Sequence, residues 1–191
     1  MMRPIRLLVL LLGAALAGCT AVTLVEPGKP AAVGDGVNVM PQVRWNQIAP
    51  RKGQTVWTQN GPAIDSVYFL TGIADGKPLY SVAGMRDADV GIFRANMLPN
   101  DVQDLVVGTM QKEGYDNVRA GSLAPCPFGA ATGFCFDLDF ATKDGLLMKG
   151  KVLAITRNNT LNVFEFRAPS EYYFAALVPT VDKIFASVEG K

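Results

Sequence analysis

The chain of 191 residues contains no histidine. Histidine is the commonest general base and the commonest metal ligand in proteins. Its absence excludes a Ser-His-Asp or Cys-His catalytic site within this chain. It also excludes the usual catalytic zinc sites, nearly all of which use histidine ligands. Any catalysis would therefore rest on other groups, of which paired carboxylates are the main candidates.

The chain also lacks an excess of either charge. It has 18 lysines and arginines against 17 aspartates and glutamates, a formal net charge of +1 at pH 7. Nucleic-acid binding calls for a basic face, so we expect no nucleic-acid partner. The glycines form neither a G-x-x-x-x-G-K phosphate loop nor a strand–GxGxxG–helix unit. We therefore expect no cofactor.

Long hydrophobic runs are scarce as well. The run from Leu7 to Ala17 is shorter than the roughly 20 apolar residues that span a bilayer. It follows two arginines and ends in small residues, which is typical of a secretory signal. The next residues complete the motif LAGC (Leu16–Cys19), which resembles the lipobox of bacterial lipoproteins. The resemblance implies cleavage before Cys19, a diacylglycerol on its thiol and an acyl chain such as palmitate on its new amine.

This resemblance divides the chain and places it in a compartment. Residues 1–18 would be the signal peptide, residues 19–36 a lipidated flexible tether rich in Pro, Gly and Ala, and residues 37–191 one periplasmic domain. The enterobacterial pattern for inner-membrane retention has an aspartate after the cysteine. Thr20 stands there instead, which favours the outer membrane. The alternative is an ordinary signal peptide with an incidental cysteine.

Only Cys126 and Cys135 follow Cys19, in the stretch CPFGAATGFC. Export would place them in an oxidising compartment, where such a pair normally forms a disulfide. A redox-active pair is the alternative. Redox motifs usually have two residues between the cysteines, whereas eight lie between these two, so a structural disulfide is favoured.

The stretch GFCFDLDFAT predicts a strand with one buried face, because Phe136 and Phe140 alternate with Asp137 and Asp139. A three-residue loop, 143–145, would close a hairpin between Thr142 and Leu146. That register pairs Phe140 with Met148, Phe136 with Val152, Asp139 with Lys149 and Asp137 with Lys151. A third strand is expected over Leu161–Arg167, after an odd-length loop that keeps Phe164 and Phe166 on the side of Phe136.

Two helices are expected around these strands. Residues 101–113 have helical spacing, with Asn100 as cap, Gln103 at capping-box distance and Gly114 as stop. A closing helix is expected after Ser170, where Pro179 should kink the helix or start another.

Three sets of residues are candidates for a functional site. Asp137 and Asp139 could do acid–base work or bind calcium, although lysines opposite them would make them sheet-stabilising pairs. Asp87 and Asp89 could form a loop metal site, but no wider ligand spacing supports one. Trp45 and Trp57 are a candidate ligand groove, although tryptophans in a domain of this size are more often largely buried.

The order of strands, helix, three-stranded meander and closing helix resembles the PsbP/MOG1/DcrB superfamily. The resemblance is carried by FEFRAPSEYYFAALVPTVDKIFASV, where Phe164–Arg167 lead into a helix ending at Val188. It implies an α+β fold, an antiparallel sheet flanked by helices in an α/β/α sandwich. The superfamily includes binding and assembly factors more than enzymes, and no catalytic residues transfer.

The sequence thus favours a non-catalytic lipoprotein of the outer membrane, whose periplasmic domain binds an envelope protein or another envelope ligand. One alternative is a carboxylate-based hydrolase that uses Asp137, Asp139 or Asp87. Another is a structural spacer without a ligand. Carboxylates free of lysine partners in a cleft would favour the enzyme, and an exposed apolar patch would favour binding.

Overall fold

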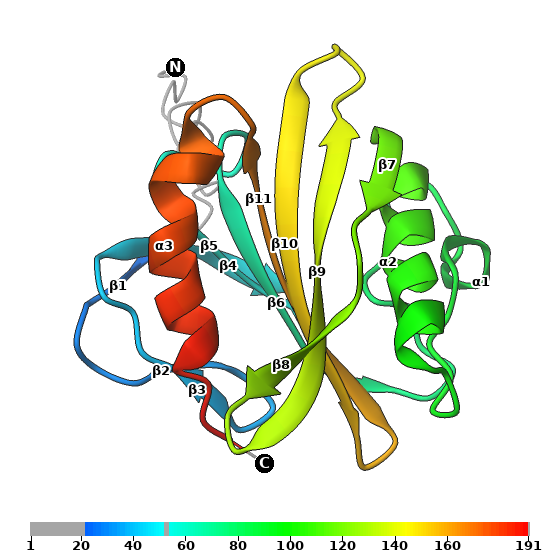
Figure 1. Cartoon of the computed structure of the whole chain (residues 1–191), viewed down its shortest axis with the longest axis horizontal. Helices are drawn as coiled ribbons and strands as arrows, with labels where there is room; N and C mark the ends of the chain where they lie inside the picture. The colour runs from blue at the N-terminus through cyan, green and yellow to red at the C-terminus, as the bar shows by residue number, and fades with distance from the viewer. Residues whose placement is uncertain (1–21, 52–53, 191) are drawn as a thin grey trace, which may run out of the picture.

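The computed structural model describes residues 22–51 and 54–190 (Figure 1). Within them, a nine-stranded antiparallel sheet has the order β1-β4-β5-β6-β11-β10-β9-β7, with β8 paired to β9. A second sheet consists of β2 and β3. In chain order the strands are β1 (Val22–Val25), β2 (Ala31–Gly34), β3 (Val37–Val39), β4 (Trp45–Arg51), β5 (Gln54–Thr58), β6 (Ser66–Ala74), β7 (Asp116–Ala120), β8 (Ala124–Phe128), β9 (Ala131–Ala141), β10 (Leu147–Arg157) and β11 (Thr160–Pro169).

Helices flank the large sheet on both sides. They are α1 (Asp87–Val90), α2 (Pro99–Glu113) and α3 (Tyr173–Ala186). On one face, α3 buries Leu177, Val181 and Ile184 in a cluster with Phe164 and Phe166 of β11. The opposite cluster joins apolar residues of α2 to those of β9 and β10, and Figure 1 shows α2 beside β7 and β9. This arrangement confirms the expected α+β class.

The β9–β10 hairpin has the register that the sequence predicts. Phe140 pairs with Met148, Phe136 with Val152, Asp139 with Lys149 and Asp137 with Lys151. The loop closes between Thr142 and Leu146, and Gly145 has a positive φ of 84°. A residue with positive φ after a tight turn suits glycine, which explains the three-residue loop.

The turn between β10 and β11 differs from the expected odd-length loop. Arg157 pairs with Thr160, so only Asn158 and Asn159 lie in the loop, and both have positive φ. Two such residues form the primed hairpin turn that matches strand twist, and asparagine tolerates this conformation.

The shorter loop reverses the faces of β11 relative to the prediction. Phe164 pairs with Leu153 and lies under α3, whereas Phe136 lies on the α2 side. Leu153 and Ile155 also lie on the α3 side, but Val163 lies on the α2 side. The prediction that Phe164 and Phe166 share a face with Phe136 is therefore wrong, because one residue fewer in the loop moves every side chain to the other face.

Residues 22–36 are part of the folded domain, so the prediction of a flexible tether over 19–36 is wrong from Val22 onward. Val25 pairs with Trp45, and β2 pairs with β3. Val33 is buried in the cluster beneath α3. The glycines that suggested a linker, Gly28 and Gly36, have positive φ and lie in turns between short strands rich in valine. Cys19 and Thr20 lie outside the described residues.

The helix ends also differ from the prediction. α2 starts at Pro99, and the carboxylate of Asp101 accepts a hydrogen bond of 2.8 Å from the backbone N–H of Leu98. Asp101 thus takes the role predicted for Gln103, whose side chain instead donates to the carbonyl of Gly121. Gly114 ends the helix in a left-handed conformation, as predicted.

α3 begins at Tyr173, three residues after the predicted cap Ser170. It continues through Pro179 to Ala186 as one helix, so the proline does not start a second one. No helix in the described ranges is long and apolar enough to cross a membrane.

Cys126 of β8 and Cys135 of β9 are brought together by the pairing of these two strands. Their Cα atoms are 5.7 Å apart and their sulfur atoms are within bonding distance. Cα distances of about 5.5–6 Å are typical of disulfides. The pair also packs against the cluster under α3, which places the bridge at the edge of that core.

We expect the folded protein to contain this bridge. Replacing both cysteines, as Cys126→Ala with Cys135→Ala, should lower the free energy of unfolding by about 2–3 kcal/mol, because the open loop gains entropy in the unfolded chain. Urea unfolding of the variant, and of the reduced wild type as its control, would measure the loss. An intact mass that shows two free thiols would contradict the expectation.

Candidate functional site

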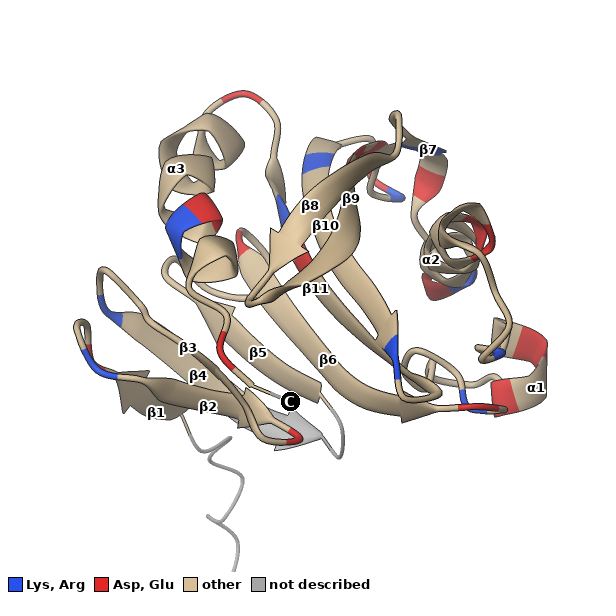
Figure 2. Ribbon diagram, turned by 60° about the horizontal axis from the view of Figure 1, so that its bottom comes forward, with Lys and Arg blue, Asp and Glu red and all other residues tan. Residues whose placement is uncertain are grey.

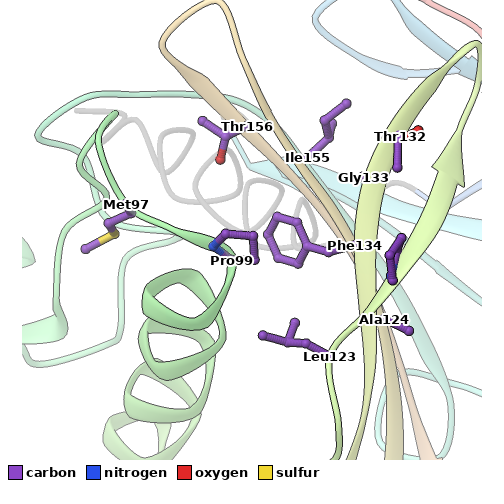
Figure 3. Close-up of a pocket in the computed structure, with 10 residues that line it drawn as sticks. Met97, Pro99, Leu123, Ala124, Thr132, Gly133, Phe134, Ile155 and Thr156 are labelled. Atoms are coloured by element: carbon purple, nitrogen blue, oxygen red, sulfur yellow. The ribbon is translucent and has the colours of Figure 1, made fainter.

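An apolar cavity of about 510 Å³ lies between the start of α2 and the strands β8, β9 and β10. Figure 3 shows Phe134 projecting from β9 toward Pro99, the first residue of α2. The lining includes no charged side chain; it consists of Met97, Pro99, Leu123, Ala124, Pro125, Thr132, Gly133, Phe134, Ile155 and Thr156. We call this the α2–β9 pocket.

Two features of the lining set the pocket's shape and polarity. Gly133 lies so close to the carbonyl of Ala154 that a side chain there would force the strands apart, so the wall is bare backbone at that point. The hydroxyl of Thr156 is inaccessible to solvent and has no hydrogen-bond partner in the described chain. Because this oxygen has no accessible surface, it presents no hydrogen-bonding group to the cavity, and the wall there is apolar in character.

A polar cluster lies on the same face of the sheet as the pocket. Its centre is Arg167 of β11, which is 2% exposed. Its guanidinium donates two hydrogen bonds to Glu165, of 2.8 and 3.0 Å. It donates a third to Glu113 of α2 at 2.7 Å and a fourth to the hydroxyl of Tyr80 at 2.9 Å. The rings of Tyr68 and Tyr115 lie 4.7 and 5.1 Å from the guanidinium carbon, within cation–π range. We call these six residues the Arg167 cluster.

Burial controls the ionisation of the cluster. It raises the pKa of Tyr80 well above 10, although the charge of Arg167 partly opposes this effect. Burial raises the pKa of Tyr68 as well, again against the opposing effect of Arg167. Burial, the largest single effect, would by itself lower the pKa of Arg167, but Glu165, Tyr80 and Glu113 together outweigh it and the pKa lies well above its usual value. Both tyrosines therefore stay neutral and Arg167 stays charged at physiological pH.

The chemistry of the Arg167 cluster is structural. Glu165, Glu113 and Tyr80 together occupy donors on all three guanidinium nitrogens, and none of the six residues lines the α2–β9 pocket. The sequence contains one signal of the cluster. In FEFR, Glu165 and Arg167 alternate with two phenylalanines inside a strand, and both fall on one face two residues apart.

The candidate carboxylates lie elsewhere. Asp139 forms an ion pair of 3.2 Å with Lys149, as its predicted pairing implies. Asp137 faces Lys151 in the register, but Lys151 instead bonds to Asp182 of α3 at 2.5 Å. Both aspartates are exposed and neither lines the α2–β9 pocket.

The loop carboxylates are also engaged with neighbouring side chains. Asp87 accepts a hydrogen bond from the hydroxyl of Ser81, and Asp89 pairs with Arg86 at 2.7 Å. Among the described residues, no three Cys, Asp or Glu side chains gather in a way that could hold a metal ion.

The two predicted groove residues are in the core. Trp45 is 1% exposed and Trp57 is 0% exposed, with ring centroids 6.4 Å apart. Trp57 packs edge-on against Phe69, and its indole N–H donates to Gln47. The tryptophans lie near each other but line no exposed groove, because β4 and β5 turn them toward the layer that α3 covers.

Solved structures include matches over nearly the whole chain. The solution structure of the cyanobacterial PsbP protein CyanoP from Synechocystis sp. PCC 6803 matches 95% of this chain and 99% of its own, with 12% identity and a TM-score of 0.52. The crystal structure of the Ran-binding protein Mog1p from Saccharomyces cerevisiae matches 90% of this chain and 96% of its own, also with 12% identity and a TM-score of 0.52. The chain therefore has a PsbP/MOG1-like fold.

At this identity the similarity shows the fold alone. LpqN is a protein involved in cell envelope biogenesis of Mycobacterium tuberculosis. Its crystal structure matches 88% of this chain and 89% of its own at 14% identity. Its TM-score of 0.36 is too low to bear on fold or function. No family model and no curated protein matches the chain.

The buried contacts of the Arg167 cluster predict how substitutions there change the free energy of unfolding. Arg167→Met should lower the free energy of unfolding by about 3–5 kcal/mol, because it leaves buried Glu165 without its partner. Arg167→Met combined with Glu165→Leu should recover most of that loss, since both buried charges are then removed. Urea unfolding would measure both effects. Arg94→Met, which removes an exposed pair with Asp75, is the control and should cost less than about 1 kcal/mol.

The raised pKa of Tyr80 predicts how the free energy of unfolding changes at alkaline pH. An unfolded tyrosine ionises near pH 10, whereas folded Tyr80 stays protonated above it. The raised pKa therefore contributes stability that is complete below pH 10 and is lost as pH rises further. Tyr80→Phe should flatten the fall of the unfolding free energy above pH 10, because it removes the group whose pKa is raised on folding. Equal slopes for Tyr80→Phe and wild type would contradict this.

Proposed function

We propose that the chain is a lipoprotein anchored in the outer membrane through Cys19, with a non-catalytic periplasmic domain that binds an envelope protein. The LAGC motif after a short apolar run supports the anchor. The two cysteines that the fold brings within bonding distance are compatible with an exported domain.

The observation that carries the binding role is the composition of the α2–β9 pocket. Its ten lining residues include no ionisable side chain, so the cavity offers neither an acid nor a base nor a nucleophilic thiol. The candidate carboxylates lie outside it, and Asp139 is paired with a lysine. A mainly apolar cavity with few polar groups is the usual form of a binding site.

The lining also indicates what the partner presents. Proline, phenylalanine, leucine and methionine side chains in this lining suit an apolar side chain of the partner. Leu98, next to the pocket residues Met97 and Pro99, is 61% exposed and extends the apolar surface at the start of α2. The Ran-binding protein Mog1p shows that the fold is compatible with protein binding.

The test is site-specific photo-cross-linking in intact cells, with a benzoylphenylalanine at Leu123 in the pocket or at Lys143 in the β9–β10 loop. We expect a defined adduct from position 123 and none from position 143. Met97→Asp should abolish the adduct by placing a charge in the apolar cavity, whereas exposed Asp137→Asn should leave it unchanged. Equal labelling from both positions would contradict the pocket as the binding site.

The anchor has its own test in the same cells. Cys19→Ala should leave the protein without lipid and without cleavage by the lipoprotein peptidase, so it should not reach the outer-membrane fraction. A Cys19→Ala variant that fractionates and migrates like wild type would contradict lipidation. A measured turnover lost in Asp137→Asn with Asp139→Asn, with the fold intact, would favour the hydrolase instead.

A further inference from the structure

The first strand of the domain presents apolar side chains on an uncovered face of the sheet. Paired residues in an antiparallel sheet share a face. Val22 pairs with Ile48, which pairs with Val56, while Leu24 pairs with Asn46. Val25 points the other way, into the cluster beneath α3. We call the side of Val22, Leu24, Ile48 and Val56 the β1 face.

No helix of the described chain packs on the β1 face. It lies on the opposite side of the sheet from α3, and Figure 2 shows α2 and α1 at the far end of the sheet, away from β1 and β4. Val22 is 60% exposed and Leu24 is 51% exposed, while Ile48 and Val56 are half-buried beside them. These side chains therefore form a continuous row across three strands instead of isolated apolar residues.

Two charged residues flank the row of apolar side chains on the β1 face, and they neutralise each other. Glu26 and Arg44 continue the alternation of β1 and β4 beyond their ends, and they pair with each other at 3.2 Å. Asn46 is the polar member of the row between them and the apolar residues. The face thus carries no net charge among these residues and can approach an apolar or interfacial surface without leaving a charge unpaired.

The position of the proposed anchor indicates which surface the β1 face contacts. Val22 is the third residue after Cys19. A fully extended chain spans at most about 3.3–3.6 Å per residue, so the lipid on Cys19 lies within roughly 11 Å of the start of β1. A domain with no long tether is held at the bilayer surface, and the strand nearest the anchor carries the exposed valine and leucine.

We infer that the β1 face rests on the phospholipid surface of the membrane that holds the anchor. This inference depends on the proposed lipidation of Cys19. Val22 and Leu24 enter the headgroup boundary, where apolar side chains are stabilised by burial. Within residues 22–51 and 54–190, β1 is also an edge strand whose single partner is β4, and the membrane surface shields its open edge from pairing with another chain.

The test uses the full lipidated protein in vesicles of phosphatidylethanolamine and phosphatidylglycerol. A single cysteine is introduced by Leu24→Cys and labelled with the fluorophore NBD; acylated Cys19 and the bridged pair Cys126–Cys135 do not react. The matched control is Thr23→Cys, on the adjacent exposed residue that points to the other side of β1. Leu147→Cys, an exposed leucine of β10, is the distant control.

We expect doxyl-labelled lipid to quench the label at position 24 at least about twofold more than the labels at positions 23 and 147, with a blue-shifted emission. Equal quenching at positions 23 and 24 would overturn the inference, because the strand would then have no membrane-facing side. Quenching of none of the three labels in vesicle-bound protein would overturn it too. Hydrogen exchange of the unlabelled protein provides a second readout, in which vesicles should slow exchange in β1 relative to the β9–β10 loop.

The intact mass separates this inference from the proposed function. Protein without acyl chains that stays in solution contradicts the anchor itself. Protein that is acylated and bound to vesicles, but whose label at position 24 is as exposed to water as that at position 147, contradicts only the orientation.

Discussion

The buried guanidinium of Arg167 fixes how α2 lies on the sheet. It joins Glu165 in its own strand to Glu113 in the last turn of α2, and it also holds the hydroxyl of Tyr80 in the segment before the helix. Breaking a buried ion pair by removing one partner is strongly destabilising, so these contacts constrain the geometry even though their net contribution to stability is modest. The N-terminal end of α2, at Pro99, forms one wall of the α2–β9 pocket. A polar cluster at one end of the helix thus positions an apolar cavity at the other.

Local pattern was enough to predict the strongest elements. The register of the β9–β10 hairpin follows from matching faces across a loop with a glycine at its end, and every predicted pair is present. The same reasoning predicted the wrong length for the loop between β10 and β11. Asn158 and Asn159 both take positive φ, which asparagine tolerates but which the pattern of apolar and polar residues does not indicate. That single residue reverses β11, so Glu165 and Arg167 face α2 and the phenylalanines face α3.

Other features depended on tertiary contacts that composition conceals. Residues 22–36 have the glycine and proline content of a linker, yet their strands are completed by partners such as Trp45 and Val39 farther along the chain. Trp45 and Trp57 lie in the core because both belong to strands under α3. The pocket residues Met97, Leu123, Phe134 and Thr156 come from four separate segments and share no motif. No sequence signal could have grouped them.

The fold itself does not decide the function, since CyanoP and Mog1p have this fold at 12% identity to the chain. The proposed function depends on the chemistry of the site and the position of Cys19: an uncharged pocket proposed to bind a partner, on a domain that begins three residues after the proposed lipid anchor. Mass spectrometry of the N-terminal peptide from membrane-extracted protein tests this most directly. The account predicts a peptide that begins at Cys19 with a diacylglycerol on its sulfur and an acyl chain on its amine. A membrane-bound protein whose N-terminus lies elsewhere, or whose Cys19 is unmodified, would contradict it.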